Sequence, residues 1–238
     1  MTADIGVVIV AAGKSARFTQ DRNADVLAKK PFAPAGGRAT WLHSAEKFFR
    51  RQDVAQIVLV VAPEDRVVVK RVFQDEIQRM KIDLADGGAE RYESVQNALR
   101  QLRSDVKIVA VHDAARPCVQ EEEIDAVFRK ARETGAAILA AQVVGSLKRA
   151  NQNVVREPVS RDNLWEAHTP QVFDRAILER AYDAIDRSAP PTDDSQLVAA
   201  LGRDVYLVPG KRTNIKITTR DDLELAELYL SAEKGRCK

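Results

Sequence analysis

The stretch VVIVAAGKSARF, residues 7 to 18, sets the fold and raises the first question about ligands. Its first half is a continuous apolar run, which is typical of a strand buried on both faces of a parallel sheet. Its second half has glycine, lysine and serine in succession, as at the end of a phosphate-binding P-loop. A P-loop needs another glycine five residues earlier, but that position is Val8, inside the expected strand. The dinucleotide fingerprint also fails, because Ser15 and Phe18 stand at its later glycine positions.

Length and composition are those of a globular protein. The chain has 238 residues, 45% hydrophobic and 30% charged, so we expect a single domain over residues 1–238. A net charge of +2 gives no reason to expect nucleic acid or an anionic membrane as a partner. No apolar run approaches the ~20 residues of a membrane span. The apolar run near the N-terminus has no basic residues before it, so we do not expect a signal peptide. Two cysteines without disulfide or metal-ligand spacing suit a reducing compartment, so we expect the cytoplasm.

Apolar runs alternate with helical patterns along the chain. After the first run come QIVLVVAP (56–63), KIVAVHDAA (107–115), AAILAAQVV (136–144) and VYLVPG (205–210). Amphipathic segments with apolar residues at helical spacing lie between them, as in Val95, Ala98, Leu99 and Leu102, and again in Ile124, Val127, Phe128 and Ala131. This alternation predicts an α/β fold with a doubly wound, mostly parallel sheet covered by helices.

Residues 145–165, GSLKRANQNVVREPVSRDNLW, interrupt this alternation. The segment is polar and has no helical apolar stripe, and NQN separates two short stretches that could pair as a β-hairpin. We therefore expect a projecting β-hairpin arm. The alternative is a long surface loop, but loops of this length are uncommon in compact domains unless they are functional.

The loop after the first strand has the character of a ligand site. Gly13 follows two alanines and precedes Lys14 and Arg17, and small residues at the carboxyl end of a strand let a ligand approach the backbone. The alternative is an ordinary turn with solvated cations. Lys29 and Lys30, ahead of a Gly-Gly turn in KKPFAPAGGR, could add positive charge around a triphosphate.

Four more stretches place polar residues directly after an apolar strand or a turn: DGGAERYESV (86–95), VHDAARP (111–117), SRDNLWEAHTPQ (160–171) and NIKIT (214–218). With AAGKSARF and KPFAPAGGR they resemble, in order and from about residue 5 to residue 230, the 2-C-methyl-D-erythritol 4-phosphate cytidylyltransferases of non-mevalonate isoprenoid biosynthesis. The resemblance implies a Rossmann-like nucleotidyltransferase domain. It also implies that segment 145–165 is a dimerisation arm that embraces a second subunit, so we expect a homodimer.

The implied reaction joins CTP to a polyol phosphate, 2-C-methyl-D-erythritol 4-phosphate, and releases pyrophosphate with Mg²⁺ as the metal. The substrate phosphate attacks the α-phosphorus of CTP. An anionic phosphate needs no general base, so the site should be rich in cations and poor in histidine and cysteine. Catalysis then depends on positioning and on stabilising charge at the reacting phosphate.

The resemblance assigns the catalytic roles to four cations. Arg17 and Lys30 match the pair that stabilises the charge developing at the α-phosphate. Arg161 and Lys216 match the pair that positions the substrate phosphate, and Arg161 would reach the active site of the neighbouring subunit. Arginine suits this task through bidentate contacts, whereas lysine acts as a point charge.

Further positions match substrate contacts. Asp113 matches a residue near the substrate hydroxyls and the Mg²⁺-nucleotide region, so it is a candidate metal ligand, although the CTP phosphates should hold the metal mainly. Arg116, Thr169 and Ser146 match other polyol contacts, with Ser146 supplying a hydroxyl. His112 is expected to be a structural neighbour. The nucleotide-binding set consists of small residues that allow backbone contacts: Ala11, Ala12, Gly13, Gly88, Ser94 and Ala114.

Two alternatives remain at this point. One is a cytidylyltransferase for another polyol phosphate such as ribitol 5-phosphate, because Gly145 and Ser146 stand where the family tends to have Asp-Thr. The other is a non-catalytic nucleotide-binding regulator. Such a regulator would be expected to lack at least one of the four catalytic cations, and all four are present: Arg17, Lys30, Arg161 and Lys216.

Overall fold

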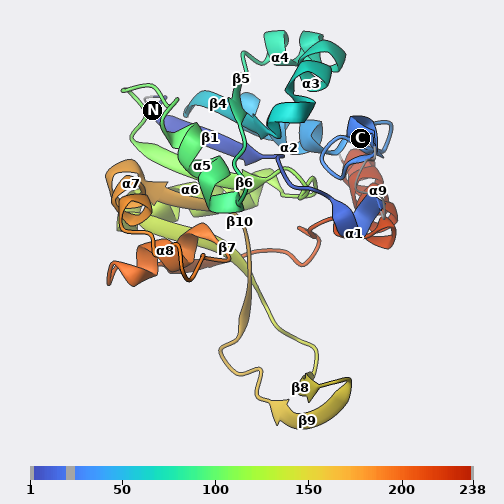
Figure 1. Ribbon diagram of the computed structural model, residues 1–238, viewed down its shortest axis with the longest axis vertical. Helices are drawn as coiled ribbons and strands as arrows, with labels where there is room; N and C mark the ends of the chain where they lie inside the picture. Colours follow the sequence, from blue (N-terminus) through green and yellow to red (C-terminus); the bar gives the residue numbers. More distant parts are fainter. Residues whose placement is uncertain (1–2, 20–24, 237–238) are drawn as a thin grey trace.

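The computed structural model describes residues 3–19 and 25–236 of the chain. Its centre is a seven-stranded sheet with the strand order β11-β7-β10-β6-β1-β4-β5 (Figure 1). Six strands run in one direction, and β10 runs antiparallel to its neighbours β6 and β7. The strands are β1 Ile5–Val10, β4 Val54–Val61, β5 Asp83–Asp86, β6 Ile108–Asp113, β7 Ala136–Gln142, β10 Trp165–Asp174 and β11 Tyr206–Pro209.

Strand β1 lies between β4 and β6 and is buried along nearly its whole length. Because side chains alternate across a strand, Val7 and Ile9 enter the hydrophobic core on one face of the sheet, and Val8 enters the core on the other. This two-sided burial explains why the sequence of β1 is continuously apolar instead of alternating.

Helices cover both faces of the sheet (Figure 1). The core that contains Val7 also receives Trp41 and Ile124, whereas the core that contains Val8 receives Val95 and Leu178. The helices of the first face are α2 Thr40–Phe49, α3 Arg66–Val72, α4 Gln74–Arg79 and α6 Glu121–Thr134, and those of the second are α5 Arg91–Leu99, α7 Arg175–Asp183 and α8 Asp194–Ala200.

A third, smaller core holds the carboxyl-terminal helix against the segments that follow β1. Phe18, Ala35, Ile217 and Leu230 pack in it. The turn in this region has Gly36 and Gly37 at φ values of 56° and 81°, a left-handed conformation that glycine adopts without steric cost. The elements are α1 Ala16–Thr19, η1 Val26–Ala28, β2 Pro34–Ala35, β3 Arg38–Ala39, η2 Pro63–Asp65 and α9 Arg220–Arg236.

The predicted arm is a two-stranded hairpin of β8 Leu147–Asn151 and β9 Val154–Val159, and it projects well away from the sheet (Figure 1). Gln152 and Asn153 connect the strands with φ values of 49° and 63°. Positive φ at both central residues is the mark of a type I′ turn, whose twist matches that of the paired strands. The prediction that the arm extends to Trp165 is wrong, because Trp165 begins β10 of the main sheet.

The predicted doubly wound, mostly parallel sheet is confirmed, and all five predicted apolar runs contain strands of it. Strands β5 and β10 were not predicted. Within the described parts of the chain, no helix has both the length and the apolar character needed to cross a membrane.

Candidate active site

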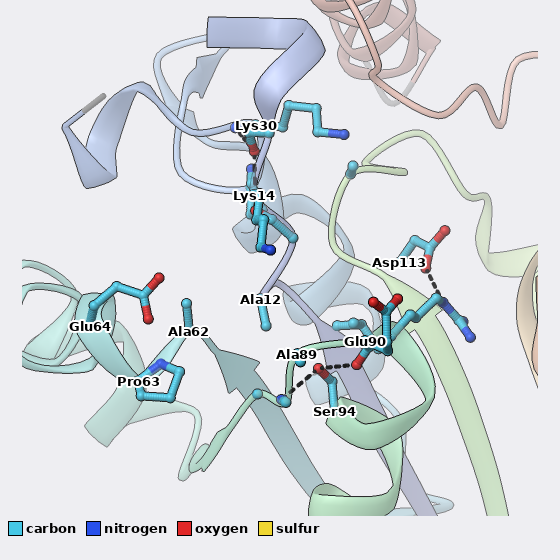
Figure 2. Close-up of a pocket in the computed structure, with 18 of the residues that line it drawn as sticks. Ala12, Lys14, Lys30, Ala62, Pro63, Glu64, Ala89, Glu90, Ser94 and Asp113 are labelled. Atoms are coloured by element: carbon cyan, nitrogen blue, oxygen red, sulfur yellow. Dashed lines mark hydrogen bonds and ion pairs between the residues drawn. The ribbon is translucent and has the colours of Figure 1, made fainter. Parts of the chain in front are cut away.

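A cavity of about 720 Å³ opens at the carboxyl end of the sheet, where β1, β4 and β6 finish. Figure 2 shows Lys14 and Lys30 on one side of it and Ala89, Glu90 and Ser94 on the opposite side. Ligands bind outside the carboxyl ends of the strands in open α/β sheets. The lining residues include Ala12, Gly13, Lys14, Ser15, Lys30, Glu64, Gly87, Gly88, Ala89, Glu90, Arg91, Ser94, Asp113 and Lys216.

Ser15 ties the loop after β1 to Lys30. Its hydroxyl oxygen accepts the backbone N–H of Lys30 at 3.2 Å and the hydroxyl donates to the carbonyl of Gly13 at 3.4 Å. Ser15 has φ 53°, a conformation that is easiest for glycine. The neighbouring Lys29 forms an ion pair with Asp65, 2.6 Å between Nζ and Oδ2. Lys30 is therefore the member of the lysine pair that lines the cavity.

The loop between β5 and α5 requires two glycines for space. A Cβ at Gly87 would lie 2.4 Å from the Cβ of Ala12, and one at Gly88 would lie 2.3 Å from the Cβ of Glu93. The hydroxyl oxygen of Ser94 accepts the Gly88 N–H at 3.0 Å, which fixes the loop above the start of α5. This close approach brings backbone, instead of side chains, to the cavity wall.

Asp113, the last residue of β6, lies between two of the cations that line the cavity. Its Oδ2 lies 2.5 Å from Lys216 Nζ and its Oδ1 lies 3.4 Å from Arg91 Nε. Burial by itself raises the pKa of Asp113, but the positive charges of Arg91 and Lys216 outweigh burial and hold that pKa well below the usual carboxyl range. Asp113 is thus an ionised carboxylate that faces two cations.

A smaller cavity of about 190 Å³ adjoins the first and shares Arg91, Asp113 and Lys216 with it. Thr169 of β10 lines this smaller cavity and connects β10 to β6, because the Thr169 hydroxyl oxygen accepts the backbone N–H of Asp113 at 3.0 Å. The remaining lining residues are Arg116, Ala167, Thr169, Gln171, Thr192 and Asp193.

Arg116 and His112 form hydrogen bonds that hold the walls of this smaller cavity in place. Arg116 donates to the carbonyls of Asn214 at 2.6 Å and Ala167 at 3.3 Å. His112 Nε2 lies 3.1 Å from the Arg116 carbonyl, so Nε2 carries the proton, and Nδ1 accepts from the Thr169 hydroxyl at 3.1 Å. Burial lowers the pKa of His112 to about 4. His112 is accordingly a neutral structural group, as expected.

The structure brings most of the predicted residues together. Lys30, Lys216, Asp113, Ala12, Gly13, Gly88 and Ser94 line the larger cavity, and Arg116 and Thr169 line the smaller one. Ala11 and Ala114 do not line either cavity. They are buried behind the larger one, and their N–H groups donate to the carbonyls of Val60 and Val10.

Three predicted residues stand apart from this group. Ser146 and Arg161 are exposed at the base of the arm and do not line the cavities of their own chain. Arg161 donates there to the carbonyl of Val144. The side chain of Arg17, in α1, lies outside the described part of the structure.

Arg91 is the main site residue that the sequence did not reveal. It stands first in α5 and contacts Asp113 on one side and Asp194 on the other, 2.8 Å between Nη2 and Oδ2. An arginine after a glutamate at a helix start has the pattern of solvated surface charge. Its signal in the sequence is its position inside the stretch DGGAERYESV, which is predicted to lie at the cleft.

The family of 2-C-methyl-D-erythritol 4-phosphate cytidylyltransferases, IspD, has a family model that matches residues 5–232. The chain belongs to this family. A family enzyme from Rhodopirellula baltica is 42% identical over 240 residues, with 96% of each chain covered. Another from Bacillus pumilus is 35% identical, with 96% of this chain and 98% of the relative covered.

Solved structures agree with this membership. The crystal structure of 2-C-methyl-D-erythritol 4-phosphate cytidylyltransferase from Thermus thermophilus superposes with a TM-score of 0.76 at 28% identity. The match covers 94% of this chain and 98% of that one. The IspD structure from Francisella tularensis gives the same TM-score and identity, with 95% and 99% covered. The Rossmann-like nucleotidyltransferase fold and the class of CTP-dependent cytidylyltransferase enzymes follow from this membership.

Proposed function

We propose that this chain joins CTP and 2-C-methyl-D-erythritol 4-phosphate to form 4-diphosphocytidyl-2-C-methyl-D-erythritol and pyrophosphate. The observation that carries the proposal is the larger cavity, which combines backbone walls at the strand ends with Lys14, Lys30 and Lys216. Among the described residues that line it there is no histidine or cysteine. Such a lining suits a reaction between two phosphates better than one that needs a general base or a thiol nucleophile.

In the proposed mechanism an oxygen of the polyol phosphate attacks the α-phosphorus of CTP in line with the leaving pyrophosphate. The new bond joins the two phosphates, and the bond from the α-phosphorus to the pyrophosphate oxygen breaks. Lys30 and Arg17 stabilise the negative charge that grows on the α-phosphate. Lys216, together with Arg161 supplied by the second subunit, holds the attacking phosphate, so that the enzyme acts mainly by positioning and by charge.

The nucleotide would bind over Ala12, Gly13 and the Gly87–Gly88 loop, where small or absent side chains let the base and ribose reach the backbone. Ala11 and Ala114 then support these contacts from behind and do not touch the ligand. The polyol would occupy the smaller cavity beside Asp113, within reach of Arg116 and Thr169. The two substrates meet where the cavities share Asp113 and Lys216.

Mg²⁺ is the metal we propose for this reaction. No group of three or more histidine, cysteine, aspartate or glutamate side chains that could hold a metal is found among the described residues. Mg²⁺ usually binds through one or two carboxylates together with substrate phosphates, so the carboxylate of Asp113 would suffice for a metal that is held mainly by the CTP phosphates. When bound, the ion would neutralise charge on the triphosphate.

We further propose that the chain acts as a homodimer in the cytoplasm. Arg161 and Ser146 lie at the base of the projecting arm, away from the cavities of their own chain, which is where an arm that embraces a second subunit would need them. Val154 and Val155 on the arm are more than half exposed, and a partner subunit would cover them. The described cysteine, Cys118, is buried and free, in keeping with a reducing compartment.

Pyrophosphate release tests the proposal. The chain, with CTP and Mg²⁺, should release pyrophosphate with 2-C-methyl-D-erythritol 4-phosphate. Release should be much slower with ribitol 5-phosphate, and ATP should not replace CTP. Release with ribitol 5-phosphate but not with the erythritol substrate would overturn the substrate assignment, and nucleotide binding without any release would favour a regulatory protein.

A further inference from the structure

A line of five charged or polar side chains runs from the interior of the protein into the active-site cavity. It consists of Tyr182, Asp194, Arg91, Asp113 and Lys216, which we call the Arg91 chain. The Tyr182 hydroxyl donates to Asp194 Oδ1 at 2.5 Å, and Arg91 Nη2 lies 2.8 Å from Asp194 Oδ2. Beyond Arg91 come Asp113 and then Lys216. These residues belong to α7, α8, α5, β6 and the segment after β11, of which α7 and α8 are consecutive elements, as are α5 and β6.

The two ends of the Arg91 chain differ in burial. In order from the inner end, the side chain of Asp194 has no exposed area, Arg91 is 26% exposed, Asp113 is 11% exposed and Lys216 is 43% exposed. The inner end is therefore fixed by packing and by the Tyr182 hydroxyl, whereas the outer end, Lys216, has room to move. Burial and the neighbouring Asp194 both raise the pKa of Tyr182, so the hydroxyl stays protonated and remains a donor.

The charges in the Arg91 chain balance in pairs. Two carboxylates, Asp113 and Asp194, face two cations, Arg91 and Lys216. Lysine is a compact point charge on a flexible stem, whereas the planar guanidinium of arginine can serve two carboxylates at once. If Lys216 leaves Asp113 to hold a substrate phosphate, Asp113 still has Arg91 as a counter-charge. A partly buried carboxylate without that second cation would hold Lys216 more strongly.

We propose that Arg91 is a positioning residue that compensates the charge of Asp113 and thereby lets Lys216 move from Asp113 to the phosphate of the polyol substrate. Asp194 and Tyr182 hold Arg91 in the orientation that this requires. The inference rests on the proposed function, because it concerns the polyol phosphate that Lys216 is expected to bind. It adds a role for three residues outside the predicted site, Arg91, Asp194 and Tyr182.

The test uses the full-length chain and two variants of the same residue, Arg91→Gln and Arg91→Lys. Arg91→Gln should raise the KM for methylerythritol phosphate by roughly tenfold, because Asp113 then retains Lys216, and should change the KM for CTP by less than about twofold. Arg91→Lys keeps the positive charge and should recover part of the lost affinity. Arg175→Gln is the matched control: Arg175 is similarly exposed and holds the loop at residues 102–106, at the amino end of β6 and so at the opposite end of the strands from the cavity. It should leave both KM values unchanged.

A double-mutant cycle with Asp113→Asn separates charge compensation from simple packing. If Arg91 acts by compensating Asp113, Arg91→Gln should weaken calorimetric binding of methylerythritol phosphate by less than about twofold when Asp113 is already asparagine. The inference is overturned by an undiminished loss in that background, by an equal rise in the KM for CTP, or by equal damage from glutamine and lysine at position 91. A wild-type chain that releases no pyrophosphate would instead overturn the proposed function, and the inference with it.

Discussion

Lys29 and Lys30 are neighbours in the sequence, yet the fold gives them different surroundings. Lys29 is paired with Asp65, whereas Lys30 lines the cavity and its backbone N–H is held by Ser15. Lys30→Ala should lower kcat by roughly a hundredfold, the usual scale for loss of one group that stabilises transition-state charge. Lys29→Ala is the matched control, and should lower the melting temperature while leaving kcat nearly unchanged. Equal loss of kcat in both variants would contradict the assignment, and steady-state kinetics with a melting curve decides it.

Buried histidines give the protein a predictable acid sensitivity. Burial lowers the pKa of both His112 and His168 to about 4. In the unfolded chain each should titrate near its ordinary value of about 6.5, so the unfolded state binds more protons between pH 6.5 and 4. The free energy of unfolding should therefore be highest above pH 7 and fall as the pH drops through that window, by on the order of 3 kcal/mol for each histidine.

His168→Gln isolates one of the two contributions. Urea unfolding of the variant and the wild type across pH 4 to 8 should give a shallower decline for the variant. Parallel curves would mean that His168 titrates alike in the folded and unfolded chain, contrary to its burial with an exposed fraction of 2%.

The contact between the end of β1 and the loop before α5 shows how elements shape the site. Because a Cβ at Gly87 would lie 2.4 Å from that of Ala12, Gly87→Ala should force the loop away from β1. We expect the KM for CTP to rise by roughly tenfold, with a smaller change in the KM for methylerythritol phosphate. Gly145→Ala is the control, since no atom lies within 4 Å of the added Cβ. An unchanged KM for CTP in Gly87→Ala would show that this loop does not form the nucleotide site.

Local patterns predicted the strands that are buried on both faces, but not β5 and β10. Strand β5, Asp83–Asp86, is short, has only two apolar residues and lies at the sheet edge. Strand β10 includes the polar run EAHTPQ, which breaks the apolar pattern because Thr169 and Gln171 serve the smaller cavity. Functional sites are where local sequence preference and the fold most often disagree.

Some residues of the candidate site could likewise be predicted from the sequence, and others could not. Lys30, Asp113 and Lys216 lie in recognisable stretches, and the family resemblance predicts their roles. Arg91 was missed because its role depends on Asp194, about a hundred positions later in the sequence, and no local pattern links them. Contacts of this kind arise only when α5, β6 and α8 are assembled around the cleft.

At the scale of the whole molecule, the arm has no packing partner in the main sheet of its own chain, and we expect a second subunit to cover it. Replacing residues 147–159 by a short Gly-Ser linker should leave the far-UV circular dichroism spectrum of the main sheet and its helices nearly unchanged, because β8 and β9 pair with each other and not with the main sheet. The shortened chain should be monomeric by light scattering and should lose nearly all turnover. A dimeric or fully active shortened chain would contradict the proposed role of the arm. Shortening the sheet strand β11 is not a suitable control, because β11 packs in the main core.

Phosphorus NMR of the complete reaction tests the central claim most directly. The full-length chain is mixed with CTP, Mg²⁺ and methylerythritol phosphate labelled with ¹⁸O on its phosphate. Attack on the α-phosphorus predicts one product with a cytidine-linked diphosphate that retains the label, together with unlabelled pyrophosphate. Release of CMP or CDP in place of pyrophosphate, or the absence of any cytidine-linked diphosphate, would contradict the account.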